Sequence, residues 1–292
     1  MVGPAGPPAR SAPAGRAAGG ALVAGACDAH VHVFGPQRDF PYVTDRRYTP
    51  PDATIEDYRA LMAALGLSRA VLSAPSIHGL DNRALLHGLA IGGPGFRGIV
   101  MVPADVDDAT LRAYHQAGVR GLRTQLKPGG GRPLEIGQLR ALAARVAPLG
   151  WHAEIHADVG EITGIDRLCD GFPVPVVIEH MGHMPAGAGA GAPGFQALLR
   201  LVRDGGWVKL SGPYINSAQP PPHEDVLPFV AALLEAAPDR AVWGTNWPHP
   251  HQDPVPDDHL LAGLLARWTG DGALMRAVLA DNPARLYDFG PA

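Results

Sequence analysis

The sequence predicts an α/β protein built as a single (β/α)8 TIM-type barrel. Three observations predict it: short apolar segments rich in β-branched residues, amphipathic helical segments between them, and a length of 292 residues that suits one barrel. Strict alternation of strand and helix favours parallel strands with helical crossovers, and eight strands close such a barrel. An open, doubly wound sheet is the weaker alternative.

Each predicted strand is an apolar run bounded by polar or turn-forming residues. The predicted strands are 26–34, 70–74, 98–103, 119–126, 151–157, 174–181, 207–211 and 241–246. A helix is predicted over 54–65, because Thr54 and Asp57 have the spacing of a capping box ahead of an apolar stripe. Further helices are expected to begin near residues 81, 107, 135, 161, 194, 224 and 256.

The first 25 residues differ in composition from the rest, being almost wholly Ala, Gly, Pro and Arg. Such a segment buries too little apolar surface to offset the entropy of ordering it, so 1–25 is predicted to be a disordered tail before a barrel domain over 26–292. A signal peptide is the competing interpretation, but its apolar run is too short, and a cytoplasmic location is expected. No stretch has the roughly 18 consecutive apolar residues of a membrane span.

Charge and cysteine content narrow the choice of partners. The net charge is −4 and no run of Lys or Arg occurs, so neither nucleic acid nor a membrane is predicted as a partner, whereas a small molecule is. Whether the chain forms a homo-oligomer is left open.

Cys27 and Cys169 lack any metal-binding spacing and are expected to be reduced core residues.

Strand alternation predicts which side chains face the barrel interior. In 151–156, apolar Trp151 and Ile155 share one face, which we expect to pack against helices, so Glu154 must point inward. The same rule places inward Asp28, His30, His32, Arg123, Gln125, His152, His156, His180 and Asn246. Because active sites of such barrels lie at the carboxyl ends of the strands, we expect one cavity there.

The inward residues have the chemistry of a catalytic site. Neutral imidazoles transfer protons near neutral pH and bind divalent cations, so His30, His32 and His180 are candidates for both roles. The catalytic candidates are His30, His32, His180, Asn246 and Glu154, and the candidates for substrate binding are Arg123, Lys127, Tyr48, His78, His156, Tyr214 and His249. The competing interpretation is a buried, hydrogen-bonded network without a catalytic role.

Several motifs, taken in order, resemble the amidohydrolase superfamily (amidohydrolase 2 type). The resemblance extends from about residue 27 to 289, and it is strongest to the 2-pyrone-4,6-dicarboxylate hydrolase branch of lactone hydrolases. The motifs are Asp28-Ala29-His30-Val31-His32, Arg47-Tyr48-Thr49-Pro50, His78-Gly79-Leu80-Asp81-Asn82, Glu179-His180-Met181-Gly182, Trp243-Gly244-Thr245-Asn246-Trp247-Pro248-His249-Pro250 and Asp281-Asn282-Pro283-Ala284-Arg285-Leu286-Tyr287.

The resemblance implies a hydrolase in which an acid on the eighth strand activates water against a lactone carbonyl. His30, His32 and His180 match the histidines around that acid, but Asn246 stands where the acid is usual. An amide cannot accept a proton, so Asn246 can only orient water or donate a hydrogen bond. Galactarolactone isomerases of the same branch resemble the chain in the segment containing Asn246.

A second departure concerns the substrate. The dicarboxylate hydrolases typically have Arg where this chain has His183, and again where it has Pro213 to Asn216. Fewer cations imply fewer substrate carboxylates, so another anionic or polyhydroxylated lactone is expected. Arg123, Lys127 and Arg132 remain on and after the fourth strand, and an Arg fork there is expected to bind one carboxylate.

The sequence is compatible with three functions. The first is hydrolysis of a lactone or similar cyclic ester of an anionic small molecule, with His30, His32, His180 or Glu154 as the base. Lactone isomerisation is the alternative enzyme, and a catalytically silent barrel that binds a small molecule is the third. A decarboxylase is a weaker alternative. Either no cofactor is required or one divalent cation, such as zinc, binds His30, His32 and His180.

Overall fold

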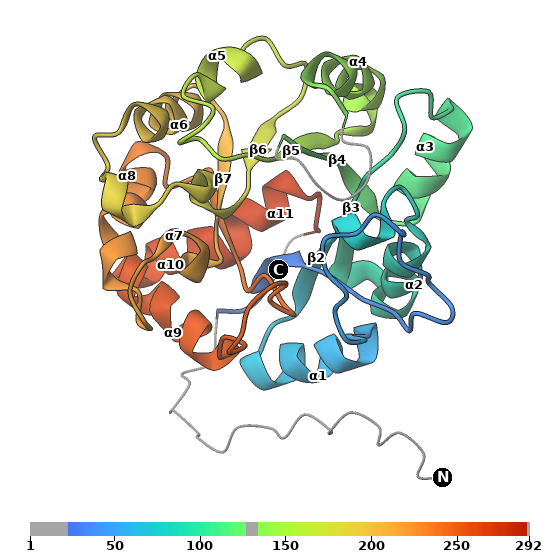
Figure 1. The fold of residues 1–292 in the computed structure, drawn as a ribbon, viewed down its shortest axis with the longest axis horizontal. Coiled ribbons are helices and arrows are strands. Elements are labelled where there is room, and N and C mark those ends of the chain that lie inside the picture. Colours follow the sequence, from blue (N-terminus) through green and yellow to red (C-terminus); the bar gives the residue numbers. More distant parts are fainter. Residues whose placement is uncertain (1–22, 127–133, 291–292) are drawn as a thin grey trace.

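The computed structural model describes residues 23–126 and 134–290, which form a (β/α)8 barrel (Figure 1). Eight parallel strands follow one another in chain order around the sheet, as predicted. They are β1 Cys27–Val31, β2 Arg69–Ser73, β3 Phe96–Val100, β4 Val119–Gln125, β5 His152–His156, β6 Val176–Ile178, β7 Trp207–Ser211 and β8 Ala241–Gly244.

The barrel closes just beyond the end of β8. There the backbone N–H of Asn246 donates to the carbonyl of His30 at 3.0 Å, and the N–H of His32 donates to the carbonyl of Trp247 at 2.8 Å. These bonds join the last strand to the first. They also place Asn246 beside the histidine pair, although the two segments are more than two hundred residues apart in the chain.

Helices surround the strands (Figure 1). The longer ones are α1 Ile55–Leu65, α2 Arg83–Gly92, α3 Asp108–Gln116, α4 Ile136–Val146, α6 Pro193–Arg203, α8 Leu227–Ala236 and α9 Asp258–Thr269, and the short ones are α5 Ile165–Cys169, α7 Pro213–Asn216, α10 Gly272–Arg276 and α11 Asn282–Leu286. The predicted capping box of α1 is confirmed, since Thr54 and Asp57 bond reciprocally. None of the helices in the described ranges is long and apolar enough to cross a membrane.

The apolar core lies in two places. A large outer cluster fills the layer between strands and helices, and a smaller one fills the amino-terminal end of the barrel, where Tyr287 and Phe289 pack with Cys27, Val71 and Val242. Residues 286–289 therefore fill the end of the barrel opposite the cavity. Cys27 is buried, as is Cys169, and neither forms a disulfide, as predicted.

The predicted facing of β5 is confirmed. Trp151 donates its indole N–H to His115 of α3 on the outer side at 3.1 Å, while His152 and Glu154 are buried within the barrel. The predicted facing of Asp28 is wrong. A β-bulge interrupts β1 between Asp28 and Val31, and the Asp28 carboxylate instead accepts a hydrogen bond from the Tyr58 hydroxyl of α1.

Some sequence predictions fall on parts of the chain that are not described. Residues 1–22 of the predicted tail, Lys127 and the rest of the segment 127–133 lie outside the described residues. Val23 is described, and it packs against the core at the turn that leads into β1.

Candidate active site

A cavity of about 420 Å³ opens at the carboxyl ends of the strands. Of the residues singled out from the sequence, those that line it are His32, Tyr48, Arg123, Gln125, His156, His180, Tyr214 and Asn246. His30 and Glu154 lie in a buried network that contacts the lining residue His32, and His249 lies behind Tyr214. His78 packs against Tyr42 and does not line the cavity.

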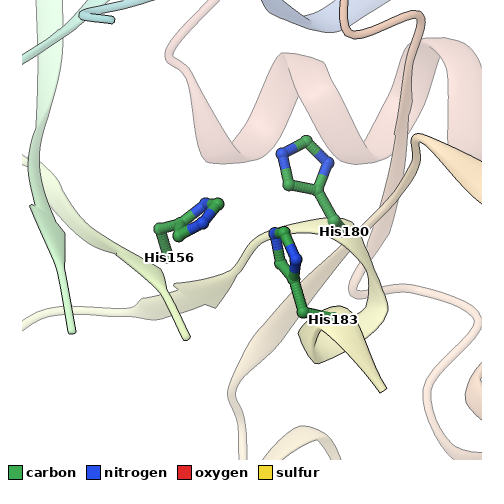
Figure 2. A group of neighbouring side chains, drawn as sticks. All are labelled: His156, His180 and His183. Carbon is green, nitrogen blue, oxygen red and sulfur yellow. The ribbon is translucent and has the colours of Figure 1, made fainter. Parts of the chain in front are cut away.

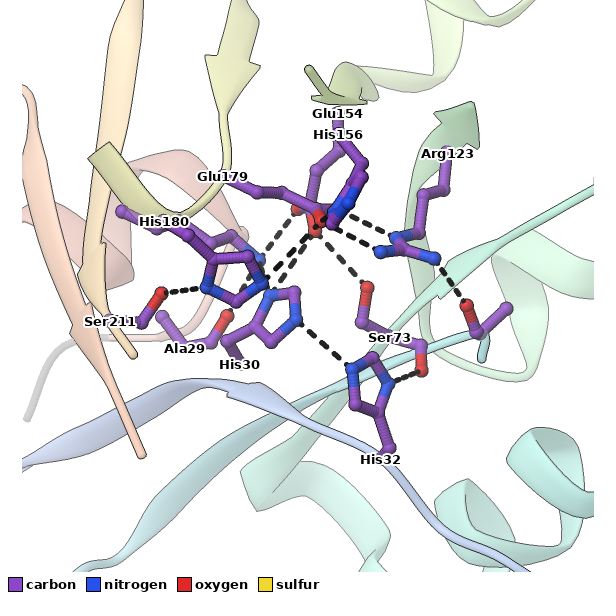
Figure 3. A network of polar contacts seen from close by, with 12 residues as sticks. Ala29, His30, His32, Ser73, Arg123, Glu154, His156, Glu179, His180 and Ser211 are labelled. Atoms are coloured by element: carbon purple, nitrogen blue, oxygen red, sulfur yellow. Dashed lines mark hydrogen bonds and ion pairs between the residues drawn. The ribbon is translucent and has the colours of Figure 1, made fainter. Parts of the chain in front are cut away.

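His30 on β1 and His32 just after it are joined directly, with 3.2 Å between the two Nε2 atoms (Figure 3). His32 Nδ1 lies 2.7 Å from the carbonyl of Ser73, which can only accept, so this nitrogen carries the proton. His32 Nε2 then accepts from His30 Nε2–H. His30 Nδ1 in turn accepts from the ammonium of Lys209 at 3.1 Å. The surroundings thus select one tautomer for each ring.

His30, His32 and His180 are neutral at neutral pH. Burial, reinforced by the Lys209 cation, holds the pKa of His30 well below its ordinary value. Burial and the Arg123 cation lower the pKa of His32 to about 4, and burial lowers that of His180 to about 3. These rings can donate and accept hydrogen bonds, but they are weak bases at neutral pH.

Two buried carboxylates are each held by a cation. Lys209 Nζ lies 2.7 Å from Glu154 Oε2. Arg123 donates through Nε and Nη2 to both oxygens of Glu179 at 2.6 and 2.7 Å, and Figure 3 shows this pair. Burial alone would raise the pKa of Glu154, but Lys209 keeps it well below its ordinary value. Arg123 does the same for the pKa of Glu179. Both carboxylates are therefore ionised and already paired.

Glu179 and Lys209 belong to the site but were not selected as site residues from the sequence. The sixth strand was expected to run through Met181 with His180 facing inward, which would turn Glu179 outward. In the structure β6 ends at Ile178, Val177 belongs to the interior cluster, and Glu179 follows the alternation inward. His180 also enters the barrel, because its backbone takes the left-handed conformation with φ of 50°. For Lys209 a signal was available in β7. Alternation that turns the apolar Val208 and Leu210 outward turns Lys209, which lies between them, into the barrel.

Three imidazoles meet at the mouth of the cavity (Figure 2). One nitrogen from each of His156, His180 and His183 lies within 4.8 Å of the others. His156 Nδ1 bonds Glu179 at 2.8 Å, and His180 Nδ1 bonds the Ser211 hydroxyl at 2.8 Å. Such partners on the far nitrogen orient a histidine for metal binding.

These three residues fit a divalent cation such as zinc, which takes nitrogen ligands and leaves a position open for water. A cation bound there would polarise a carbonyl or lower the pKa of water. A second group, His30, Glu179 and His180, also has ligand atoms within 4.8 Å of one another. It fits less well, because His30 Nδ1 faces the Lys209 cation and Glu179 is paired with Arg123. The set expected from the sequence, His30 and His32 with His180, is not among the groups found in the described residues.

The wall of the cavity at the end of β8 is polar. Asn246 Nδ2 donates to the hydroxyl of Tyr214, on α7, at 2.9 Å. The rings of Tyr48 and His251, which also line the cavity, pack at a tilt with their centroids 3.9 Å apart, and Arg47 lines the rim. His183, His251 and Arg47 were not selected from the sequence as site residues. They lie on loops, where side-chain direction follows no period.

Comparison with known proteins agrees with the geometry. The chain is 38% identical to a 4-sulfomuconolactone hydrolase of Rhizobium radiobacter, over 97% of this chain and 95% of the relative. It is 36% identical to a 2-pyrone-4,6-dicarboxylate hydrolase of Comamonas testosteroni, over 91% of each. It is 31% identical to a D-galactarolactone isomerase of Agrobacterium fabrum, over 95% of this chain and 96% of the relative.

Solved structures share the architecture. A crystal structure from Agrobacterium tumefaciens superposes with a TM-score of 0.84 at 30% identity, covering 93% of this chain and 98% of that one. A structure described as a putative 2-pyrone-4,6-dicarboxylic acid hydrolase of Pseudomonas putida gives a TM-score of 0.81 at 34% identity, covering 93% and 100%. The amidohydrolase family model matches residues 27–289, nearly the whole described chain. The chain therefore belongs to the amidohydrolase family.

Proposed function

We propose that the protein hydrolyses the ester bond of a lactone that carries an anionic group. The observation that supports this most strongly is the identity of 38% and 36%, over more than nine-tenths of the chain, to relatives named as hydrolases of a muconolactone and of a pyrone. A pyrone is itself an unsaturated lactone. The cavity at the carboxyl ends of the strands has the position and polar lining that such a reaction needs.

The cations around the cavity indicate a substrate with few negative charges. The Arg123 fork, expected from the sequence to bind a carboxylate of the substrate, is occupied by Glu179, and its Nη1 donates to the carbonyl of Ala74 at 3.0 Å. Arg47 lines the rim and is exposed, so we assign the anionic group of the substrate to Arg47. Lys127 and Arg132, the other cations expected to bind it, lie outside the described residues.

The remaining lining residues suit a lactone ring. His156, His180 and His183 point toward one another (Figure 2) and can hold the carbonyl, or a water beside it, by hydrogen bonds. The amide of Asn246 is a further donor at the wall. Placing preorganised donors where negative charge develops is the largest contribution to acyl-transfer catalysis in many enzymes.

Mass spectrometry of products formed in heavy-oxygen water tests the proposal. A panel of lactones, with and without a carboxylate or sulfonate, is incubated with the purified chain. We expect open-chain acids that carry one heavy oxygen, formed fastest from the anionic lactones. Rearranged lactones without label would contradict the proposal and show that the protein is an isomerase. Binding without any turnover would also contradict it and show that the protein only binds a lactone.

A further inference from the structure

A chain of hydrogen bonds leads from the cavity wall to the start of α9. The Tyr214 hydroxyl lies 2.8 Å from His249 Nδ1, and His249 Nε2 lies 2.9 Å from a carboxylate oxygen of Asp258. Tyr214 lines the cavity, whereas the His249 side chain is 1% exposed and Asp258 12%. Three residues from α7, the loop after β8 and α9 are therefore aligned through one buried imidazole.

The direction of each bond follows from the groups at its ends. The Asp258 carboxylate can only accept, so His249 Nε2 carries the proton and Nδ1 presents its lone pair. Tyr214 then donates its O–H to Nδ1. Asn246 donates its amide N–H to the Tyr214 oxygen at 2.9 Å. Hydroxyl, imidazole and carboxylate stand in the order that activates a hydroxyl group in nucleophile–histidine–acid triads.

We propose that Tyr214 is the proton-transfer residue of the lactone-opening reaction and that His249 and Asp258 form the relay behind it. The inference rests on the proposed function. It supplies a proton acceptor beside Asn246, whose amide donates to the Tyr214 oxygen and cannot itself accept a proton.

Other groups of the site are less suited to this role. Glu154 is paired with Lys209, and Glu179 is paired with Arg123. His32 is buried, and burial and the Arg123 cation lower its pKa to about 4. His180 Nδ1 is already bonded to the Ser211 hydroxyl at 2.8 Å. Tyr214 itself stays neutral, because burial raises its pKa. It therefore transfers a proton in concert with His249 and does not act as a standing tyrosinate.

The reaction balances without any added reagent. A water held against the Tyr214 oxygen attacks the lactone carbonyl carbon, and the carbonyl π pair moves to its oxygen. The water proton passes to Tyr214 as the Tyr214 proton passes to His249 Nδ1, which leaves an imidazolium beside the Asp258 carboxylate. The carbonyl then re-forms, the ring C–O bond breaks, and the proton returns by the same path to the leaving oxygen.

Site-directed variants of the full chain test the relay on a lactone that the parent hydrolyses. In Tyr214→Phe the ring stays and only the hydroxyl is lost. In Asp258→Asn the charge behind His249 is lost. The matched control is Asp257→Asn, because the neighbouring Asp257 caps α9 through the N–H groups of His259 and Leu260 and makes no contact with the relay. Asn also serves well at an N-cap position.

We expect kcat to fall about a hundredfold or more in Tyr214→Phe and Asp258→Asn, the scale of a lost acid or base, with a much smaller change in KM. Asp257→Asn should keep the parental kcat, and Asp258→Glu should recover part of the lost rate. Thermal unfolding of each variant verifies the fold. Parental kcat in Tyr214→Phe or Asp258→Asn, on a lactone that the parent hydrolyses, would overturn the relay alone. A parent that hydrolyses no lactone would overturn the proposed function itself.

Discussion

Lys209 is a fully buried lysine whose three polar contacts organise the floor of the site. Its ammonium lies 2.7 Å from Glu154, donates to the carbonyl of Ala29 at 2.7 Å, and donates to His30 Nδ1 at 3.1 Å. A buried cation is tolerated only when it is paired and hydrogen-bonded. Lys209 therefore compensates the negative charge of the ionised Glu154 and also selects the tautomer of the histidine pair.

Removing this cation should be costly. We expect Lys209→Met to destabilise the fold by about 3–5 kcal/mol, because the Glu154 carboxylate would be left buried without its partner. In Lys209→Met combined with Glu154→Gln no charge is stranded, so the loss should be smaller than the sum of the two single losses. Urea denaturation of the four proteins measures both quantities. Strictly additive losses would mean that the two residues do not interact.

Alternation predicted the facing of most interior residues but failed at two local irregularities. It correctly places Glu154 and His156 inward, because β5 is a regular strand. It fails for Asp28, which a bulge turns outward, and for Glu179, which lies beside a left-handed His180. A bulge or a left-handed residue shifts the inward and outward alternation of side chains by one residue. Both depend on tertiary packing, which the sequence pattern of a single strand does not contain.

At the scale of elements, the contact between β8 and β1 closes the barrel and sets the position of the histidine pair. Gly244, the last residue of β8, allows it: a Cβ on this residue would lie 2.7 Å from the backbone nitrogen of His30 and 2.8 Å from its Cβ. The neighbouring atoms belong to the backbone or adjoin it, so they cannot move aside as a flexible side chain would.

Gly244→Ala should therefore destabilise the protein by about 1–3 kcal/mol, the usual cost of overpacking. The control is Gly263→Ala on α9, where nothing lies within 4 Å of the added methyl group. That change should stabilise the fold by about 0.5–1 kcal/mol, since alanine is the better helix former. Thermal or urea unfolding of both variants tests the pair. Equal stability of Gly244→Ala and the parent would show that the two strands separate easily.

Elements with a clear period were predicted within a few residues, and short ones were not. The capped helix α1 and all eight strands match their predicted segments. The short helices α7, α10 and α11 were not predicted, because four or five residues are too few to show a helical period. The sequence named Tyr214 as a pocket candidate. Because it lies on the unpredicted helix α7, its hydrogen-bond partners could not be predicted.

At the scale of the whole molecule, the fold follows from repetition along the chain, whereas the chemistry depends on which distant side chains meet. Strand alternation and the family resemblance predicted that His30, His32, His180 and Asn246 lie at one end of the barrel. The structure places them there. The pairing of each buried carboxylate with its cation was not predictable. It is decided by the register between strands and by residues that enter from different helices and loops.

The neutral histidines should make the whole fold sensitive to acid. The pKa of His32 is about 4 and that of His180 about 3 in the folded chain, against about 6.5 when unfolded. As pH falls below about 6.5 the unfolded chain takes up these protons first, so the free energy of unfolding should decrease towards pH 4. Asp28 acts in the opposite direction. Burial raises its pKa to about 6, so the folded chain is protonated first there, and stability from this group is lost as pH rises from about 4 to 6.

Urea denaturation at intervals between pH 7.5 and 4.5 tests this balance. We expect the free energy of unfolding to fall with acidification in the parent, because several histidines outweigh one aspartate. We expect it to fall more steeply in Asp28→Asn, where the opposing group is gone. The variant is also expected to be less stable at pH 7.5, because Asp28 accepts from the backbone and hydroxyl of Thr245 at 2.9 and 2.6 Å; the slope with pH therefore carries the test. A parent whose stability is constant or rises between pH 6.5 and 4.5 would show that the buried imidazoles are protonated in the folded chain.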